Sequence, residues 1–292
     1  MSTSFRPNWL RVLSTLLLTM AAGPWFSALA APGKDNCYDR AKVPPEHRQN
    51  SVHTVVLLDE TTVFDNIQRQ HIQSQLAGLL EDGSTTELIF FSAFSQGRYS
   101  MPGPVFKLAA ALPAAVKYDL RKDDVQDFEV CLLASKKRAA HALSNAVDGY
   151  FSRATSDLAR SDIFAVLKDI GETVLPRTTA RDRRIVLVSD MLENSDISSF
   201  YSRGVPRAIK PEDELAKLKS KGMIADLRRV KVFVIGAAVV PHGATQGHDT
   251  YRPASVLGPL KAFWASYFQE SNSQLVAFGQ PLLLSPIVEM GK

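Results

Sequence analysis

The sequence predicts an α/β fold with a doubly wound, mostly parallel central sheet and helices on both faces. Thr54–Leu58 is an unbroken apolar and β-branched run, which is typical of a parallel strand buried on both faces. Arg184–Val188 and Val230–Ala238 have the same character. Segments with helical amphipathic spacing separate these runs, and strands that alternate with helices indicate a parallel α/β sheet.

The chain has 292 residues, of which 45% are hydrophobic, so it is able to build a sizeable core. Its first thirty residues form a separate segment. Arg6 and Arg11 precede the short apolar stretch Val12–Ala22, and Ala28-Leu29-Ala30 follows as a small-x-small cleavage site. This pattern predicts a secretory signal peptide over residues 1–30. The alternative is an uncleaved anchor, although the apolar stretch is shorter than the roughly 20 residues that a span needs.

The mature protein is expected in the periplasm or outside the cell, and no later segment is apolar enough to cross a bilayer. Removing Arg6 and Arg11, with no acidic residue before position 31, lowers the formal net charge from +4 to +2. Such a weak charge argues against a nucleic-acid partner. Cys37 and Cys131 are the two cysteines, and in an exported protein they suggest one disulfide, with two separate thiols as the alternative.

Residues 31–51 are rich in proline and polar residues and are expected to form an extended leader. Residues 52–285 are expected to form the α/β domain, with an insertion near 113–127, and residues 286–292 a tail. The first helix, Val63–Glu81, has an apolar stripe that is expected to face the core: Phe64, Ile67, Ile72, Leu76, Leu79 and Leu80.

Further apolar runs predict the other strands of the sheet, namely Thr86–Phe94, the edge strand Val105–Leu112, Phe128–Leu133 and a closing edge strand within Leu275–Leu284. Helical periodicity predicts the other helices, namely Ala134–Leu158, Ile163–Val174, Glu212–Asp226 and Ala254–Gln269. The aromatic stripe of the last helix, Phe263, Trp264, Tyr267 and Phe268, is expected to be core packing. Pro241–Pro253 is expected to be a polar loop.

Polar residues stand where two of the buried strands end. Asp59 follows the first strand, and Asp190 follows Arg184–Val188. Ser161 and Asp162 precede the helix Ile163–Val174, where either residue suits the N-cap. Since open α/β sheets bind ligands outside the carboxyl ends of their strands, we expect this edge to be the functional one.

At these three turns the chain resembles a von Willebrand factor A domain. In that family an Asp-x-Ser-x-Ser turn, a Thr at a helix entrance and an Asp after a later strand build a metal-ion-dependent adhesion site. Asp59-Glu60-Thr61-Thr62-Val63 resembles the first turn, Arg160-Ser161-Asp162-Ile163 the second, and Val186-Leu187-Val188-Ser189-Asp190 the third. The resemblance covers roughly residues 51–285 and departs at Val63, which has no hydroxyl.

The resemblance implies an exported, non-enzymatic module for protein docking or scaffolding. The implied metal ligands are Asp59, Thr61, Ser161 and Asp190, with outer support from Thr62, Asp162 and Asp65. Carboxylate and hydroxyl oxygens suit Mg²⁺ or another hard divalent cation, and a partner's Asp or Glu can complete the coordination. Without a hydroxyl at Val63 the site is expected to be weakened or vestigial. In the alternative, the hydroxyls only cap helices and the aspartates bind backbone.

A second reading makes the same edge catalytic. The strand ending in Asp59 also resembles haloacid dehalogenase-like phosphatases, in which such an aspartate is the phosphoryl acceptor, and Ser92 and Asp190 lie in suggestive places. That family needs a second acid two residues later, where this chain has Thr61, so the leaving group lacks its general acid. A third reading is a purely structural component of an envelope assembly.

Other arrangements of chemistry-bearing residues give weaker signals. His242, His248 and Asp249 lie in a glycine-containing loop and have ligand types suited to a transition metal, but a solvated polar loop is the more common explanation. His71 and His141 stand alone within helices. No phosphate-binding loop, dinucleotide fingerprint or nucleophile elbow is present.

Overall fold

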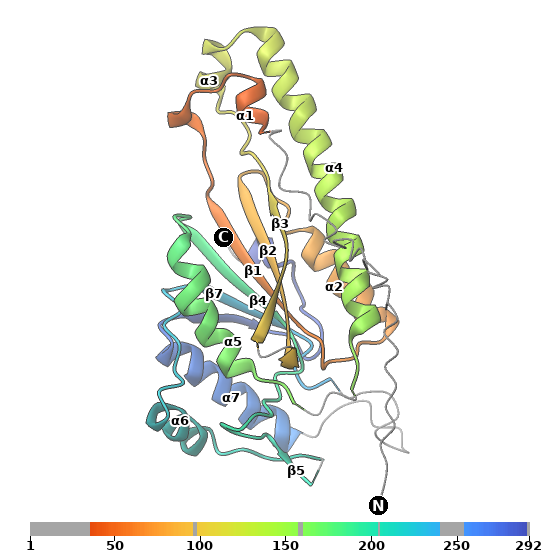
Figure 1. Ribbon diagram of the computed structural model, residues 1–292, viewed down its shortest axis with the longest axis vertical. Coiled ribbons are helices and arrows are strands. Elements are labelled where there is room, and N and C mark those ends of the chain that lie inside the picture. The colour runs from red at the N-terminus through yellow and green to blue at the C-terminus, as the bar shows by residue number, and fades with distance from the viewer. Residues whose placement is uncertain (1–35, 96–97, 157–159, 204, 240–253, 291–292) are drawn as a thin grey trace, which may run out of the picture. The chain divides into compact units, whose positions relative to one another are not determined.

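The fold is built on a six-stranded sheet with the strand order β3-β2-β1-β4-β7-β8 (Figure 1). The computed structural model describes residues 36–95, 98–156, 160–203, 205–239 and 254–290. Within these ranges, residues 93–95, 98 and 99 are described by their backbone alone. The strands of the sheet are β1 Val52–Asp59, β2 Ser84–Ser95, β3 Arg98–Lys107, β4 Asp182–Val188, β7 Lys231–Ile235 and β8 Gln274–Phe278. All neighbours are parallel except β2 and β3, and a separate hairpin joins β5 Tyr201–Ser202 to β6 Val205–Pro206.

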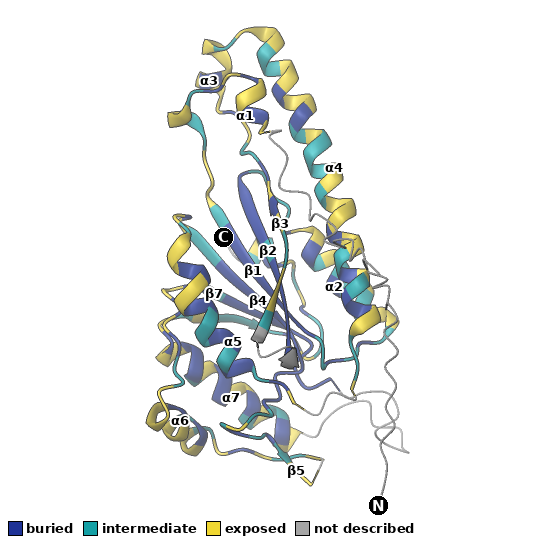
Figure 2. Ribbon diagram, viewed as in Figure 1, coloured by how far each residue is buried: buried dark blue, intermediate teal, exposed yellow. Residues whose placement is uncertain are grey.

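Helices cover both faces of the sheet, as the doubly wound prediction requires. Alternation along β1 sends Val55 and Leu57 into one core and Val56 and Leu58 into a second core on the other face. The sheet interior is accordingly buried (Figure 2). The helices are α1 Cys37–Arg40, α2 Asn66–Ala77, α3 Ala114–Asp119, α4 Lys122–Arg153, α5 Ile163–Asp169, α6 Pro211–Ser220, α7 Ala254–Glu270 and α8 Ile287–Met290. The predicted α/β class is confirmed.

The first core lies between the sheet and helices α5 and α7. The aromatic residues of α7 are fully buried there, so their predicted role in core packing is confirmed. The Phe263 and Trp264 rings are 5.2 Å apart in an edge-to-face arrangement, and Phe164 of α5 packs on Trp264 at 5.3 Å. Edge-to-face contacts of this kind add to the stabilisation that comes from burying the rings.

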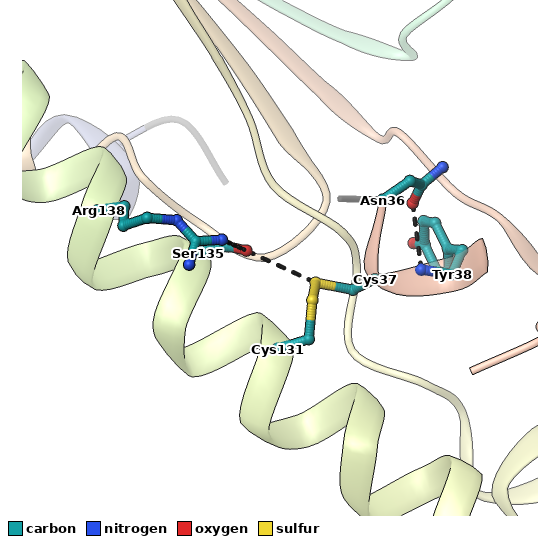
Figure 3. The surroundings of a disulfide bond; sticks show 6 residues. All are labelled: Asn36, Cys37, Tyr38, Cys131, Ser135 and Arg138. Atoms are coloured by element: carbon teal, nitrogen blue, oxygen red, sulfur yellow. Dashed lines mark hydrogen bonds between the residues drawn. A yellow bond between two sulfur atoms is a disulfide. The ribbon is translucent and has the colours of Figure 1, made fainter. Parts of the chain in front are cut away.

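The N-terminal half of α4 extends past the sheet and packs with α1 and α3 around a small core of its own (Figure 1). We call this part the extension: α1, α3 and residues 122–137 of α4. The predicted disulfide is confirmed, since Cys37 of α1 is bonded to Cys131 of α4 (Figure 3). Tyr38 stacks against Phe128 beside it, with ring centroids 5.5 Å apart. The segment expected as an extended leader is therefore partly helical and tied to the body.

The prediction of a strand at Phe128–Leu133 is wrong, because these residues lie within α4. Phe128 and Cys131 are buried, whereas Val130 and Leu133 are 61% and 56% exposed. Burial at a spacing of three residues is helical, and the apolar run hid it because its exposed positions are apolar too. The segment 113–127, expected as an insertion, contains α3 and the first turns of α4.

Smaller differences concern the ends of elements. Ile67 was expected in the core but is 71% exposed, because α2 begins only at Asn66 and this first turn faces outward. The predicted edge strand is β3, which covers residues 98–107 and not 105–112 and is antiparallel to β2. The predicted signal peptide and the loop with His242, His248 and Asp249 lie outside the described residues. No helix in the described parts of the chain combines the length and apolarity needed for a membrane span.

Candidate functional site

The candidate site centres on Asp59, the last residue of the central strand β1, whose side chain is completely buried. Its Oδ1 accepts hydrogen bonds from the Thr61 backbone N–H at 3.0 Å and the Thr61 hydroxyl at 2.6 Å. Its Oδ2 accepts from the Ser161 hydroxyl at 3.1 Å and the Ser189 hydroxyl at 2.7 Å. Three turns that are far apart in the sequence therefore meet at one carboxylate.

Further hydrogen bonds tie these turns together. The Asp190 backbone N–H donates to the Thr62 hydroxyl at 3.1 Å, joining the third turn to the first. Backbone bonds between Ser161 and Asn194 join the second turn to the segment that follows Asp190. The Tyr150 hydroxyl of α4 donates to the Asp59 carbonyl at 2.9 Å. The convergence thus depends on the sheet and on α4 as well as on the turns.

The turn after β4 has a constrained backbone. Met191 is fully buried and has φ 62°, a left-handed conformation that costs a residue other than glycine about 1 kcal/mol. The Met191 carbonyl accepts a hydrogen bond from the Trp264 indole at 2.9 Å, and the Ala238 N–H donates to the Asp190 carbonyl at 2.8 Å. The Asp190 carboxylate accepts from the Leu192 N–H at 2.9 Å. Strain of this kind persists only where the surroundings hold it, and it concentrates at functional turns.

Glu193 is a site residue that the sequence did not reveal. Its buried carboxylate accepts hydrogen bonds from the Ile163 and Phe164 backbone N–H groups at 2.8 and 3.3 Å, so it caps helix α5. The sequence suggested Ser161 or Asp162 for this role. Asp162 occupies the N-cap position without a side-chain cap bond, and the Ser161 hydroxyl is directed to Asp59. A cap that comes from thirty residues away leaves no local sequence signal.

The other predicted support residues are placed as follows. Thr62 is buried and bonds the Asp190 N–H, as described above. Asp65 is the N-cap of α2, where its carboxylate accepts from the Gln68 N–H at 2.8 Å within a capping box. Asp65 therefore serves the helix end, and its carboxylate is engaged there.

Burial dominates the electrostatics of the site. It raises the pKa of Asp59, although the hydroxyl and amide donors around the carboxylate act in the opposite direction. It also raises the pKa of Glu193 well above the usual range. The pKa of the Tyr150 hydroxyl is raised well above normal by burial first and by the charges of Asp59, Glu60 and Asp190 next. The negative charges of the site therefore disfavour ionisation of this phenol.

The donor chemistry fits a hard divalent cation. Thr61 and Ser161 each donate their hydroxyl proton to Asp59, so the lone pairs of both oxygens stay available for a cation. In the part of the chain that the structure describes, no group of three or more His, Cys, Asp or Glu side chains has metal-site geometry. An ion here would therefore depend on hydroxyls and two aspartates, a set suited to Mg²⁺ with several waters retained.

The phosphatase reading fits the geometry poorly. A phosphoryl acceptor must be reached by its substrate, but the Asp59 side chain is 0% exposed and both its oxygens accept two hydrogen bonds. Ser92 is buried as well. The arrangement holds the carboxylate in place and does not present it to a substrate.

No protein-family model and no curated protein matches the chain. Among solved structures it is similar to an aerotolerance-related membrane protein from Bacteroides fragilis, with 12% identity and a TM-score of 0.37 over 82% of this chain and 94% of that one. For BatB from Bacteroides thetaiotaomicron the identity is 11% and the TM-score 0.38, over 82% and 95%. For the pilus adhesin SpaC from Lactobacillus rhamnosus GG the identity is 12% and the TM-score 0.34, over 77% of this chain and 31% of that one. At such low identity and TM-score, function has to be argued from the site itself.

Proposed function

We propose that this chain is an exported docking module that binds a protein partner at the carboxyl edge of its sheet through a divalent cation. The observation that supports the proposal is the convergence of the Thr61, Ser161 and Ser189 hydroxyls on the buried Asp59 carboxylate. Asp59 orients the hydroxyls by accepting their hydrogen bonds. The proposed ligands are Thr61, Ser161 and Asp190, with Asp59 as the group behind them.

Few protein charges around such an ion leave it electron-poor. An acidic side chain of a partner is then a favourable further ligand, because carboxylate oxygen suits hard cations. Val63 supplies no hydroxyl, so the cation is expected to bind weakly in the absence of a partner. Cation binding and partner binding are therefore coupled in this proposal, and each raises the affinity for the other.

An apolar rim supports a protein partner. Ile67, in the first turn of α2 after the Asp59 turn, is 71% exposed, and Leu284 is fully exposed. A hydrogen bond joins their neighbourhoods: the Leu283 N–H donates to the ring of His71, which lies one helical turn after Ile67 in α2. Leu284 is the next residue after Leu283. Burial of the Ile67 and Leu284 side chains against a partner would contribute favourably to binding, because it removes apolar surface from water.

The disulfide supports the proposed location. Bonds such as Cys37–Cys131 persist in oxidising compartments such as the periplasm or the extracellular space and are rare in the cytosol. With the predicted signal peptide, this favours a periplasmic or secreted protein.

Capture of partners from envelope extracts tests the proposal. The immobilised protein is compared with Asp190→Asn, which alters a proposed ligand, and with Ile67→Asp, which alters the rim, each with Mg²⁺ and with a chelator. Wild type is expected to retain a partner in Mg²⁺ only. Both variants should lose it, because the ligand and the rim contribute to the same contact.

Tyr118→Asp is the matched control for the rim variant, since Tyr118 is 90% exposed but lies on the extension, away from the Asp59 turn. This control is expected to behave as wild type. Retention of the same partner by Asp190→Asn, or equal capture with the chelator, contradicts the cation-mediated contact.

A further inference from the structure

The positive charge of the chain is concentrated in two segments, residues 170–184 and 221–231. Together they contain eight Lys or Arg and three Asp or Glu, a net charge of +5. The whole chain has a net charge of +4, so the remainder carries −1. We call the exposed and half-exposed arginines of these segments the arginine edge: Arg177, Arg181, Arg183, Arg228 and Arg229.

Four of these arginines meet at the amino edge of the sheet, opposite the Asp59 site, and Arg177 ends the 3-10 turn that precedes β4. Arg181 and Arg183 stand at the beginning of β4, and Arg228 and Arg229 directly precede its neighbour β7. Neighbouring strands are about 4.8 Å apart, so the two groups adjoin. The two segments also touch directly, since a Cβ on Gly171 would lie 2.7 Å from the Asp226 carbonyl.

The charge of the arginine edge is not neutralised within the described chain. Of the basic residues nearby, Arg184 is buried and pairs with Glu81 and Asp182, and Lys231 pairs with Asp182. Among the described residues, by contrast, no carboxylate lies within ion-pair distance of any member of the arginine edge. Five uncompensated guanidinium groups of one sign form a surface that attracts anions.

The backbone of two of these arginines is strained. Arg228 and Arg229 have φ 53° and 62°, a left-handed conformation that is unfavourable for residues other than glycine. Two hydrogen bonds hold the turn. The Arg228 N–H donates to the Asp226 carboxylate at 3.0 Å, and the Arg229 N–H donates to the Asn272 carbonyl at 2.6 Å. Glycine is the favoured residue in this conformation, so arginine at both positions points to a role for the side chains.

We propose that the arginine edge is a second docking surface, which binds a protein partner through a surface rich in Asp and Glu. Guanidinium groups pair with carboxylates through two parallel hydrogen bonds, so a surface rich in Asp and Glu suits them. An anionic bilayer is the competing occupant of such a surface, and the test below separates it from an acidic protein. A disulfide-bonded, exported chain has little access to nucleic acid.

Fluorescence anisotropy with a labelled poly-glutamate peptide at low salt tests this inference, with anionic vesicles and duplex DNA as competing probes. The double variant Arg181→Glu/Arg228→Glu is expected to bind the peptide at least about tenfold more weakly than wild type, because it removes two favourable charges and adds two unfavourable ones. Wild-type affinity should fall as salt rises. The neutral variant Arg181→Gln/Arg228→Gln should lie between the two.

Arg40→Glu/Arg121→Glu is the matched control, since it changes the net charge equally on two exposed arginines, Arg40 of α1 and Arg121 directly before α4. It is expected to bind the peptide as wild type does. Equal weakening in both double variants would mean that net charge alone acts, and this overturns the proposal. Tighter binding to vesicles or DNA than to the peptide also overturns it, as does the absence of peptide binding. Circular dichroism and urea unfolding of each variant exclude misfolding as the cause.

Discussion

Replacing Asp59 with alanine tests whether the carboxylate holds the three turns together. The change leaves four donors without their acceptor in a fully buried place: the Thr61 N–H and the hydroxyls of Thr61, Ser161 and Ser189. A hydrogen bond to a charged group contributes about 1.5–3 kcal/mol, but removal of the buried charge returns part of this. We therefore expect Asp59→Ala to lower the free energy of unfolding by about 3 kcal/mol.

Urea unfolding followed by circular dichroism measures this loss, provided that the transition is two-state in both proteins. Asp65→Ala is the control, since it removes the same group from the next turn but breaks only the cap of α2. Its expected cost is about 1 kcal/mol. If Asp59→Ala costs no more than Asp65→Ala, the carboxylate does not organise the three turns, and the reasoning above is refuted.

Three further changes probe the framework around the site. Replacing Cys37 and Cys131 with serine should lower the free energy of unfolding by about 3–5 kcal/mol, because the bond closes a loop with a sequence separation of 94 residues; a loss below about 1 kcal/mol in urea unfolding contradicts this. Glu193→Gln should flatten the pH dependence of stability. The pKa of Glu193 is raised in the folded state, so wild type loses stability as the pH rises from the unfolded-state pKa of Glu193 through its folded-state pKa. The Gln variant should lack this loss, and parallel stability profiles of the two proteins would contradict the prediction. Trp264→Phe removes the indole bond to the Met191 carbonyl and should cost about 1 kcal/mol or more; unchanged stability would show that this bond does not hold the turn.

The sequence predicted the parts of the fold that depend on local pattern. Thr54–Leu58 and Arg184–Val188 were recognised as buried strands because an unbroken apolar run has few other uses in a soluble domain. The turns after them followed from topology, since the ends of parallel strands meet at one edge. The convergence of Asp59 with Ser189 in the structure has this origin.

Other features depend on contacts that local pattern does not encode. Within Phe128–Leu133, Val130 and Leu133 are apolar but exposed, so the helical period of the buried Phe128 and Cys131 could not be read from the sequence. Glu193 caps a helix that begins thirty residues earlier. Ser189 was seen only as part of the third turn, although its hydroxyl makes one of the shorter bonds to Asp59. Such roles become visible only when the chain is folded.

Calorimetric titration with Mg²⁺ and Mn²⁺ tests the central claim, that hydroxyls held by Asp59 form a cation site which Val63 weakens. We expect weak binding to wild type and roughly tenfold tighter binding to Val63→Ser, which supplies an oxygen ligand at this position. Thr61→Val, which keeps the shape but removes a proposed ligand, should abolish the heat. No heat from wild type or from Val63→Ser, or an unchanged isotherm for Thr61→Val, would contradict a cation site formed by these hydroxyls.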